Sequence, residues 1–409
     1  FLIAGIRFSA ASLWAYIISL STFIIFICAP ALGAIADFSA SKKKFLMAFC
    51  WCGSLFATLL FFCGEGDVWK TMFFFLVAQV CFVGGNVFYD AFLPHIASED
   101  HMDRVSGKGY AFGYVGGGIQ FALSLAFITF HDRLGIDRPL AARIAMAAAG
   151  LWWAGFSLFT FTRLKEAAAS ESLPREYRAF AKPVAYARLG VARTIATAQK
   201  VRRFKHLLLF LTAFMIYDDG IQTVITMATM YGASELGLEA SSLMLTLLII
   251  QFIAAFGAWT FSRLGGRFGA KRALLLTLAL WAGVVVYAYF IKTSSEFMIL
   301  GIVAGLCMGG SQSLSRSLYG SMIPARSSAE FYGFYSVFSK FSAIWGPLVF
   351  GVVRQVTGSS RNSILAIMAF FILGIVLLSL VDVRKAREAR ESEIFGEFRP
   401  ALEAGLTAS

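Results

Sequence analysis

Residues 33–44 read GAIADFSASKKK, a short basic loop that separates two long apolar runs. A helix needs roughly 20 apolar residues to cross the hydrocarbon core of a bilayer, and both neighbouring runs have that length. Only helices and closed barrels satisfy every backbone group in lipid, and continuous apolar runs lack the alternating pattern of a barrel. Each run therefore predicts a membrane-spanning helix. Eleven such windows occur, near residues 12–35, 45–64, 69–94, 108–130, 140–162, 206–231, 240–262, 271–291, 296–322, 331–353 and 362–382.

The composition supports an all-α polytopic membrane protein and excludes an ordinary soluble one. Hydrophobic residues make up 58% of the 409 residues and charged residues 15%, whereas a soluble domain has roughly 25% charged residues. The net charge of +12 is compatible with a nucleic-acid partner. However, the lysines and arginines lie mostly between apolar runs, as the positive-inside rule describes. We therefore expect the lipid bilayer as a partner and no nucleic acid.

The basic residues gather in every second loop, which predicts the orientation of the chain. Three lysines at 42–44 follow the first run, and Arg163 and Lys165 follow the fifth. The loop after the seventh run and the stretch after the last run are also basic, while the loop at 131–143, on the opposite side, is mixed. We place the basic loops and the C-terminal tail in the cytoplasm. The lack of an evident signal peptide or glycosylation sequon favours a bacterial inner membrane.

A polar stretch divides the apolar runs into five before it and six after it. The predicted organisation is an N-terminal transmembrane bundle at 1–163, a basic cytoplasmic linker at 164–205, a C-terminal transmembrane bundle at 206–383 and a cytoplasmic tail at 384–409. From Ala185 onward, the linker has the composition of a basic amphipathic helix lying on the membrane surface. A plain solvated linker is the alternative.

The two groups of runs resemble each other. The third run reads GGNVFYD from residue 84 and the ninth reads GGSQ from residue 309, and each is followed by a proline. The fourth run opens with YAF at residue 110 and the tenth with YGF at residue 332. Membrane transporters are often built from such repeats. When the pairs are matched, the sixth run has no counterpart ahead of the first run. We therefore expect two pseudo-symmetric six-helix bundles, of which the first bundle lacks its first helix here. The chain also begins without methionine.

Twelve helices in two halves, joined by a basic linker, resemble the major facilitator superfamily. The loop at 33–44 resembles the signature G-x-x-x-D-R-x-G-R-R/K of that family, because it keeps the glycine, the aspartate and the trailing basic residues. It departs from the signature at Phe38, Ala40 and Ser41, where the family usually has Arg, Gly and Arg. The second copy, after the seventh run, keeps the basic part but has Gly266 at the place of the aspartate.

A closer resemblance is to the vacuole-effluxer-like, autophagy-related branch of that superfamily. It rests on the stretches YDAFLP from residue 89, VSGKGY from 105, YDDG from 217, GGSQSLSR from 309, FYGFY from 331 and SKF from 339. The likeness covers essentially the whole chain. Because fungal members of the branch look like exporters of amino acids from the vacuole, the resemblance favours amino acids or short peptides as substrates.

Charged residues inside the apolar runs are the strongest functional candidates, because each costs roughly 2.5–3.5 kcal/mol to insert. Asp218 and Asp219 lie roughly 18 Å into their run at about 1.5 Å per residue. Successive residues differ by about 100° around a helix, so we expect one carboxylate to line a cavity and the other to meet a neighbouring helix. Lys340 reaches a similar depth in the tenth run. This predicts an ion pair with Asp218 or Asp219, which is either static or broken by substrate or a proton.

Further polar residues occur in symmetry-related runs. Asp90 and Arg316 lie nearer the cytoplasmic ends, where they either pair across the halves as an inner gate or contact loops of their own half. Asn86, Gln222 and Gln312 offer neutral hydrogen bonds to a polar substrate. Each of these three side chains can equally join one helix to another.

The resemblance also implies a gate at the cytoplasmic side. Asp37 is expected to face the N-terminus of the run that begins near Phe331, because the partial positive charge of a helix N-terminus favours a carboxylate. That contact would hold the cytoplasmic side closed. Gly33 and Arg267 belong to the two copies of the signature and are assigned to the same gate. A loop carboxylate retained in water is the alternative for Asp37.

The chain carries no nucleotide-binding motif, no metal-ligand cluster and no catalytic triad. We therefore expect no cofactor and no enzymatic activity, and an ion gradient must drive any pumping. The leading hypothesis is a monomeric secondary transporter that moves a small polar or amphipathic solute by alternating access, with a coupling proton. A lipid or lysolipid flippase of the same fold, and a non-transporting receptor or scaffold, are the alternatives.

Overall fold

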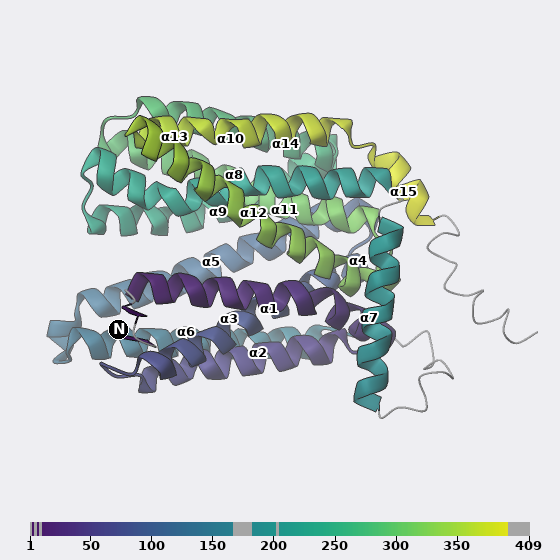
Figure 1. Cartoon of the computed structure of the whole chain (residues 1–409), viewed down its shortest axis with the longest axis horizontal. Coiled ribbons are helices and arrows are strands. Elements are labelled where there is room, and N and C mark those ends of the chain that lie inside the picture. Colours follow the sequence, from purple (N-terminus) through teal and green to yellow (C-terminus); the bar gives the residue numbers. More distant parts are fainter. Residues whose placement is uncertain (1, 4–5, 8–9, 167–181, 202–203, 392–409) are drawn as a thin grey trace, which may run out of the picture. The chain divides into compact units, whose positions relative to one another are not determined.

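The computed structural model describes residues 2–3, 6–7, 10–166, 182–201 and 204–391, most of which are helical (Figure 1). Within these residues, 11 helices are long and apolar enough to cross a membrane. Each predicted window overlaps one of them, which confirms the all-α membrane fold. The spans are Tyr16–Phe38, Lys42–Phe62, Val68–Ile96, Glu99–Thr129, Arg138–Arg163, Lys205–Ala233, Ser241–Phe268, Ala270–Phe290, Ser294–Met322, Ala325–Thr357 and Ser360–Leu380.

The elements are numbered along the chain as in Figure 1. Two short strands, β1 (Leu2–Ile3) and β2 (Ile6–Arg7), pair in antiparallel fashion ahead of the first helix. The first half of the sequence contains α1 (Ala10–Phe38), α2 (Lys42–Leu59), α3 (Val68–Ala91), α4 (Leu93–Ile96), α5 (Met102–Thr129) and α6 (Arg138–Arg163), with 3₁₀ turns at Leu60–Phe62, Glu99–His101 and His131–Leu134. Pro94 has no N–H to donate to the carbonyl of residue 90, which accounts for the end of α3 at Ala91.

The second half begins after the linker helix α7 (Lys182–Val201). It contains α8 (Lys205–Leu236), α9 (Ala240–Phe268), α10 (Ala270–Phe290), α11 (Ser294–Met322), α12 (Ser328–Thr357), α13 (Ser360–Ala366), α14 (Met368–Leu380) and α15 (Val383–Glu391), with a 3₁₀ turn at Ala325–Ser327. Helix α6 ends at Arg163 and α8 begins at Lys205, while the predicted division into bundles, linker and tail stays a prediction.

Within the described residues, one compact unit, here unit 1, spans 1–92, 119–194 and 329–336. Its helix α2 packs against both α3 and α6. Small residues allow this approach, since a Cβ added at Gly53 would lie 2.4 Å from the Trp153 ring.

The other compact unit, unit 2, spans 93–118, 195–328 and the described residues from 337 on. Helix α11 is mostly buried and packs against α9, where a Cβ added at Gly309 would lie 1.9 Å from the carbonyl oxygen of Ala254. The buried Trp281 ring of α10 stacks on Phe371 of α14, with 6.0 Å between the ring centroids. These contacts form the core around α8, which carries the buried acids.

The compact units differ from the halves of the sequence in one respect. Helix α4 and the part of α5 as far as Gly118 belong to unit 2 with the C-terminal helices. The first turns of α12, residues 329–336, belong to unit 1 with the N-terminal helices. Each half of the sequence thus contributes one helix end to the unit built mainly from the other half.

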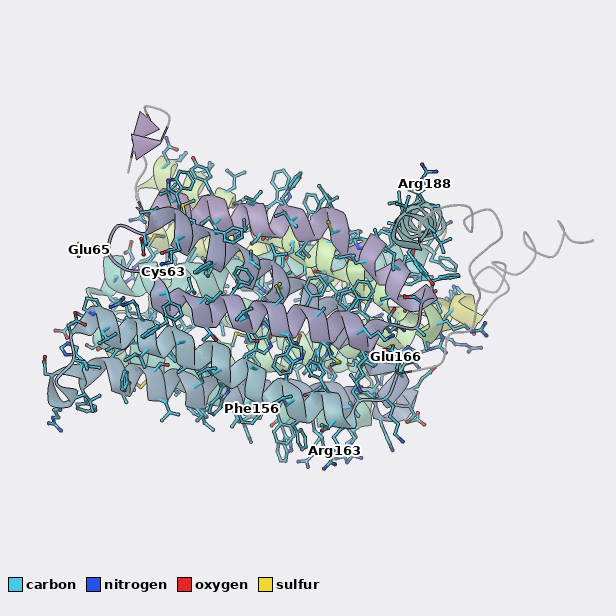
Figure 2. All side chains as sticks on the ribbon, turned by 90° about the horizontal axis from the view of Figure 1, so that it is seen from below. Cys63, Glu65, Phe156, Arg163, Glu166 and Arg188 are labelled. Atoms are coloured by element: carbon cyan, nitrogen blue, oxygen red, sulfur yellow. The ribbon has the colours of Figure 1, made fainter. Side chains whose placement is uncertain are left out.

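The loops of unit 1 lie at two opposite ends. In Figure 2, Glu65 lies at the end opposite to Arg163, Glu166 and Arg188. The basic loop lies at the Arg163 end, because the Lys43 Nζ donates to the carbonyl of Leu164 across 2.8 Å. The assignment of this end to the cytoplasm stays a prediction.

Helix α7 crosses the end of α1 in unit 1 (Figure 1). Gly190 contacts Ile35, and the Tyr186 ring lies 6.1 Å from the Phe38 ring between centroids. Val191 is exposed on another face of α7. The predicted helix in the linker is therefore present, whereas its position on a membrane surface stays a prediction. The rest of the predicted linker, at 167–181 and 202–203, and the tail from 392 lie outside the described residues.

Candidate functional site

Two adjacent carboxylates lie in the middle of α8, as the sequence indicates. The exposed fractions of Asp218 and Asp219 are 4% and 1%. Both contact α12, at different heights along that helix, so the expectation that one of them lines an open cavity is wrong. The spacing of the two residues around α8 predicts only the direction in which each side chain points. It does not predict that a single neighbouring helix, α12, contacts both side chains.

Asp218 is held by neutral hydrogen-bond donors. Its Oδ2 atom accepts from the hydroxyl of Ser342 at 2.8 Å and from that of Ser339 at 3.2 Å. Gln222, one turn along α8, lies near this carboxylate. The sequence reasoning missed the two serines. Their i, i+3 spacing on either side of Lys340 is the signal that both lie on one face of α12, and that face meets the carboxylate.

Lys340 interacts electrostatically with Asp218 but not by direct contact. No carboxylate of the described residues lies within 4.0 Å of its Nζ atom, so the predicted ion pair is not formed. The two serine hydroxyls occupy the Asp218 oxygen instead. Lys340 is half-buried near the middle of its span. Within the described residues, its ammonium group donates no hydrogen bond to a carboxylate.

Asp219 has a different partner, the backbone of α12. Its Oδ1 atom accepts a hydrogen bond from the Gly346 N–H at 2.8 Å. Pro347 follows inside the helix, and a proline there removes one backbone hydrogen bond and weakens the local helix. A Cβ added at Gly346 would lie 1.9 Å from Thr223 Oγ1. Asp219 therefore stabilises the weak point of α12 against α8.

Arg316 of α11 is buried and fastens the first turns of α5. Its Nε atom donates to Ser106 Oγ at 3.0 Å, and its Nη2 atom donates to the Ser106 carbonyl at 2.8 Å. Its guanidinium carbon lies 4.3 Å from the centroid of the Tyr110 ring. The Ser106 hydroxyl in turn donates to the Ser313 carbonyl at 2.7 Å. Arg316 thus contacts α5, a helix from the other half of the sequence, which neither of the two predicted arrangements described.

The remaining polar candidates are spread over both units. Gln312 accepts a short hydrogen bond from the Tyr114 hydroxyl, which joins α11 to α5. Asn86 is exposed on α3 in unit 1, and Asp90 lies one turn further along that helix. The predicted pairing of Asp90 with Arg316 relates two different units and stays a prediction.

The signature loop meets the start of α12 inside unit 1, as the resemblance implies. Asp37 accepts hydrogen bonds from the Glu330 N–H at 2.8 Å and the Ala329 N–H at 3.2 Å. Lys42 forms an ion pair with the same carboxylate at 2.7 Å. A Cβ added at Gly33 would lie 2.3 Å from the Ala329 carbonyl oxygen, so a larger residue there would separate α1 from α12. The contact is confirmed, and its action as a gate stays a proposal.

Two further residues of the signature copies, Ala40 and Arg267, have these surroundings. Ala40 has a φ of +44°, in the left-handed region that favours glycine, which is the family residue at this position. In the second copy, Arg267 is exposed at the end of α9, with its guanidinium 5.4 Å from the Phe268 ring. The assignment of Arg267 to the gate stays a prediction.

Comparison of the sequence with known proteins gives consistent matches over nearly the whole chain. A sequence model of the family described as "Vacuole effluxer Atg22 like" matches residues 1–391. YxiO of Bacillus subtilis, an uncharacterised MFS-type transporter, is 34% identical over 380 residues, which are 92% of this chain and 86% of YxiO. Autophagy-related protein 22-1 of Aspergillus niger is 24% identical over an alignment that covers 94% of this chain and 75% of that protein.

Comparison with solved structures shows the major facilitator fold. The transporter FucP in its outward conformation matches with a TM-score of 0.69 and 13% identity over 92% of this chain and 91% of FucP. The human organic anion transporter MFSD10 matches with a TM-score of 0.62 and 16% identity over 88% of this chain and 82% of that chain. At such low identity the likeness concerns the fold alone.

Proposed function

This chain belongs to the Atg22-like family of vacuole effluxers and is a transporter of the major facilitator type, and from this premise we propose that it moves a small polar solute by proton-coupled alternating access. The substrate class that we favour is an amino acid or a short peptide. The observation that carries the proposal is the environment of Asp218. This carboxylate is buried at mid-span, is hydrogen-bonded by serines, and has a cation nearby that does not neutralise it by contact.

A carboxylate in such a position suits a coupling group. The protonation of such a carboxylate depends on the charge and the hydrogen-bond donors around it, which here are Lys340 and the two serine hydroxyls. A small change in the distance between Asp218 and Lys340 would therefore shift the balance and release or take up a proton. Acids inside membrane spans mark proton pathways in many transporters.

Lys340 supplies the second part of the proposed mechanism. An ammonium group is a strong hydrogen-bond donor to a carboxylate, and the described residues leave this one without such a partner. We assign it to the carboxylate of an amino acid or peptide substrate. Substrate binding would then weaken the charge interaction between Lys340 and Asp218, which links the substrate to the proton.

Asp219 is the natural control for this proposal. It is a buried acid next to Asp218, but its acceptor oxygen serves the Gly346 N–H. The amide oxygen of asparagine can accept that same hydrogen bond. Asp219→Asn should therefore keep the helix contact, whereas Asp218→Asn removes the titratable group from the proposed coupling site.

The test uses purified full-length protein in proteoliposomes and a panel of labelled amino acids and dipeptides. Two activities are measured, namely counterflow without a gradient and accumulation driven by an imposed pH gradient. We expect Asp218→Asn to keep counterflow and lose accumulation, and Asp219→Asn to keep both. If Asp218→Asn accumulates substrate like the wild type, proton coupling through this residue is wrong. If the wild type exchanges none of the panel, the substrate class is wrong.

A further inference from the structure

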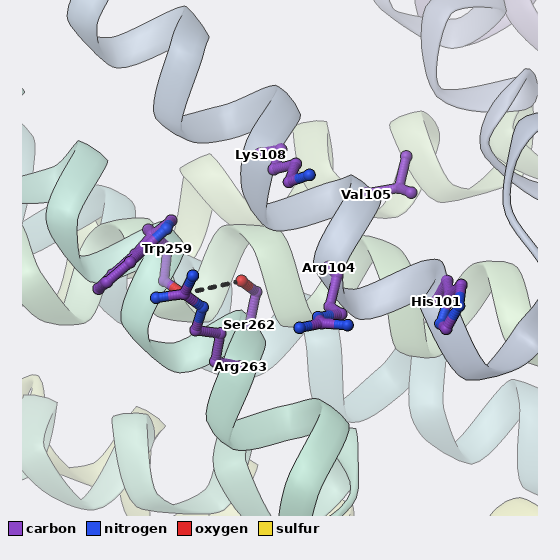
Figure 3. A pocket seen from close by; sticks show the side chains of 7 residues that line it. All are labelled: His101, Arg104, Val105, Lys108, Trp259, Ser262 and Arg263. Atoms are coloured by element: carbon purple, nitrogen blue, oxygen red, sulfur yellow. Dashed lines mark hydrogen bonds between the residues drawn. The ribbon is translucent and has the colours of Figure 1, made fainter.

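A pocket of about 280 Å³ lies between the first turns of α5 and the last turns of α9 in unit 2 (Figure 3). Its lining residues are His101, Arg104, Val105, Lys108, Trp259, Ser262 and Arg263. Three permanent cations and a histidine therefore border one small space, and the lining contains no acid. We propose that this pocket binds the headgroup of an anionic phospholipid, independently of what the protein transports.

The positive charge of the pocket is not neutralised by the acids nearest to it in sequence. Glu99 forms an ion pair with Arg390 of α15, at 2.5 Å. Asp103 lies beside Ser317 of α11 and Gly265 of α9, and it is not part of the pocket lining. In the part of the chain that the structure describes, Arg104, Lys108 and Arg263 form no ion pair within 4.0 Å. The pocket thus has charge available for an anionic ligand.

Arg263 is preoriented within the pocket. Its guanidinium carbon lies 3.6 Å from the centroid of the Trp259 indole, so the charged group rests on the ring face. Stacking of this kind leaves the N–H edge of the guanidinium available, and a guanidinium edge matches two oxygens of a phosphate. Ser262 donates to the Trp259 carbonyl across 3.0 Å and holds the same turn of α9 (Figure 3).

The pocket lies at the head of an apolar stripe on α5. At about 100° per residue, Arg104, Lys108 and Phe112 share one face of the helix. That face is opposite to Tyr110, which points to Arg316 inside unit 2. The exposed fraction of Phe112 is 76%. Along this face, the basic residues Arg104 and Lys108 are therefore followed by the apolar Phe112, which points away from the protein core.

Helix α9 repeats this order beside it. Arg263, Trp259 and Phe256 share a face that points away from α11, which contacts α9 through Ala254 and Gly309. The exposed fraction of Phe256 is 56% and that of Trp259 is 42%. The two helices touch near the pocket, because a Cβ added at Gly107 would lie 2.2 Å from the Ser262 side chain.

This arrangement favours a lipid over a soluble phosphate compound. The pocket has room for a headgroup but not for acyl chains. Next to it along the two helices, the exposed Phe112 and Phe256 supply an apolar surface along which acyl chains can lie. Tryptophan at such a boundary is typical of the membrane interface. Basic pockets between transmembrane helices are suited to anionic headgroups. Because the lining lacks an acid to meet an amine, phosphatidylglycerol should bind better than phosphatidylethanolamine.

The test is native mass spectrometry of the full-length protein in detergent, titrated with phosphatidylglycerol or phosphatidylethanolamine. The variant Lys108→Gln/Arg263→Gln removes two pocket charges. The matched control Arg272→Gln/Arg326→Gln removes two exposed charges of the same unit outside the pocket. A thermal melt of each protein establishes that both variants are folded. Glycerol phosphate at millimolar concentration serves as the soluble competitor.

We expect the pocket variant to bind phosphatidylglycerol about thirtyfold more weakly than the wild type, and the control to bind it within about twofold. Phosphatidylethanolamine should bind all three proteins weakly and alike. The proposal is overturned if the pocket variant binds like the wild type or if the control loses as much affinity. Displacement of the lipid by glycerol phosphate would also overturn it, because the site would then belong to a soluble phosphate compound.

Discussion

The backbone N–H of Glu330 donates a hydrogen bond to the carboxylate of Asp37 at 2.8 Å, although 293 residues separate them in the sequence. The carboxylate therefore lies at the N-terminus of α12, where the helix dipole favours negative charge. Lys42 pairs with the same group, and the side chains of Lys42 and Asp37 are 7% and 4% exposed. One acid thus joins the signature loop to the start of another helix.

Asp37→Asn should loosen the start of α12. The substitution removes the charge next to the helix N-terminus and breaks the buried ion pair with Lys42, and the loss of one partner of a buried pair costs about 3–5 kcal/mol. We expect amide exchange at residues 329–333 to become at least tenfold faster in hydrogen–deuterium exchange. Asp37→Asn/Lys42→Gln should recover part of this loss, while Lys44→Gln, at an exposed position, should have no effect. A double variant no better than Asp37→Asn would show that the ion pair is unimportant.

Ala40→Gly should stabilise the protein. Ala40 has a φ of +44°, where an alanine pays about 1–2 kcal/mol for its Cβ contacts and glycine does not. Since glycine loses more backbone entropy on folding, the net gain should be roughly 0.5–1 kcal/mol, seen as a rise in the thermal midpoint. Ala48→Gly, the same substitution at an exposed position inside α2, should lower the midpoint. A fall for both variants would contradict the conformational explanation.

Arg316→Lys should free the first turns of α5. The lysine keeps the charge but cannot donate to the Ser106 hydroxyl and the Ser106 carbonyl together, and it lacks the planar group that lies over Tyr110. We expect faster amide exchange at residues 102–110, by about tenfold, from the loss of one charge-assisted hydrogen bond. Arg272→Lys, at an exposed position on α10, is the matched control. Unchanged exchange in Arg316→Lys would mean that charge alone holds the junction.

Gly346→Ala should disrupt the contact between α8 and α12. The new Cβ would lie 1.9 Å from Thr223 Oγ1 and 2.8 Å from Asp219 Oδ1, and crowding of this kind in a packed interior costs about 1–3 kcal/mol. Thermal melting should show the loss, and Gly346→Ala/Thr223→Ala should recover part of it. Gly351→Ala places the same methyl on the same helix where nothing lies within 4 Å. That control should be neutral or stabilising, and equal losses at both glycines would refute the steric argument.

Much of the fold follows from the length and order of the apolar runs. The eleven windows overlap the eleven spans because lipid allows little besides a continuous helix, and α6 ends at Arg163, just before the polar stretch. The contact of Asp37 with the start of α12 was predictable only through the family signature. Nothing local in the loop indicates which distant helix the carboxylate meets.

The candidate site was predictable in its residues but less so in its contacts. Depth in a span places Asp218 and Lys340 at one level, yet a direct ion pair also depends on which way each side chain points around its helix. The hydroxyls of Ser339 and Ser342, rather than the Lys340 ammonium group, donate hydrogen bonds to Asp218. Likewise, the sequence marks Asp219 as a buried acid, while its bond to the Gly346 N–H depends on how α12 passes α8.

The exchange of helix ends between the two units has a consequence for biosynthesis. Gly33 and Asp37 leave the ribosome early, but residues 329–336, against which they pack, are made only after α11. Unit 1 is therefore completed only after most of unit 2 has been synthesised. Lys42 lies close to Asp37 in the sequence, so its ammonium group is available to pair with the carboxylate before residues 329–336 are made.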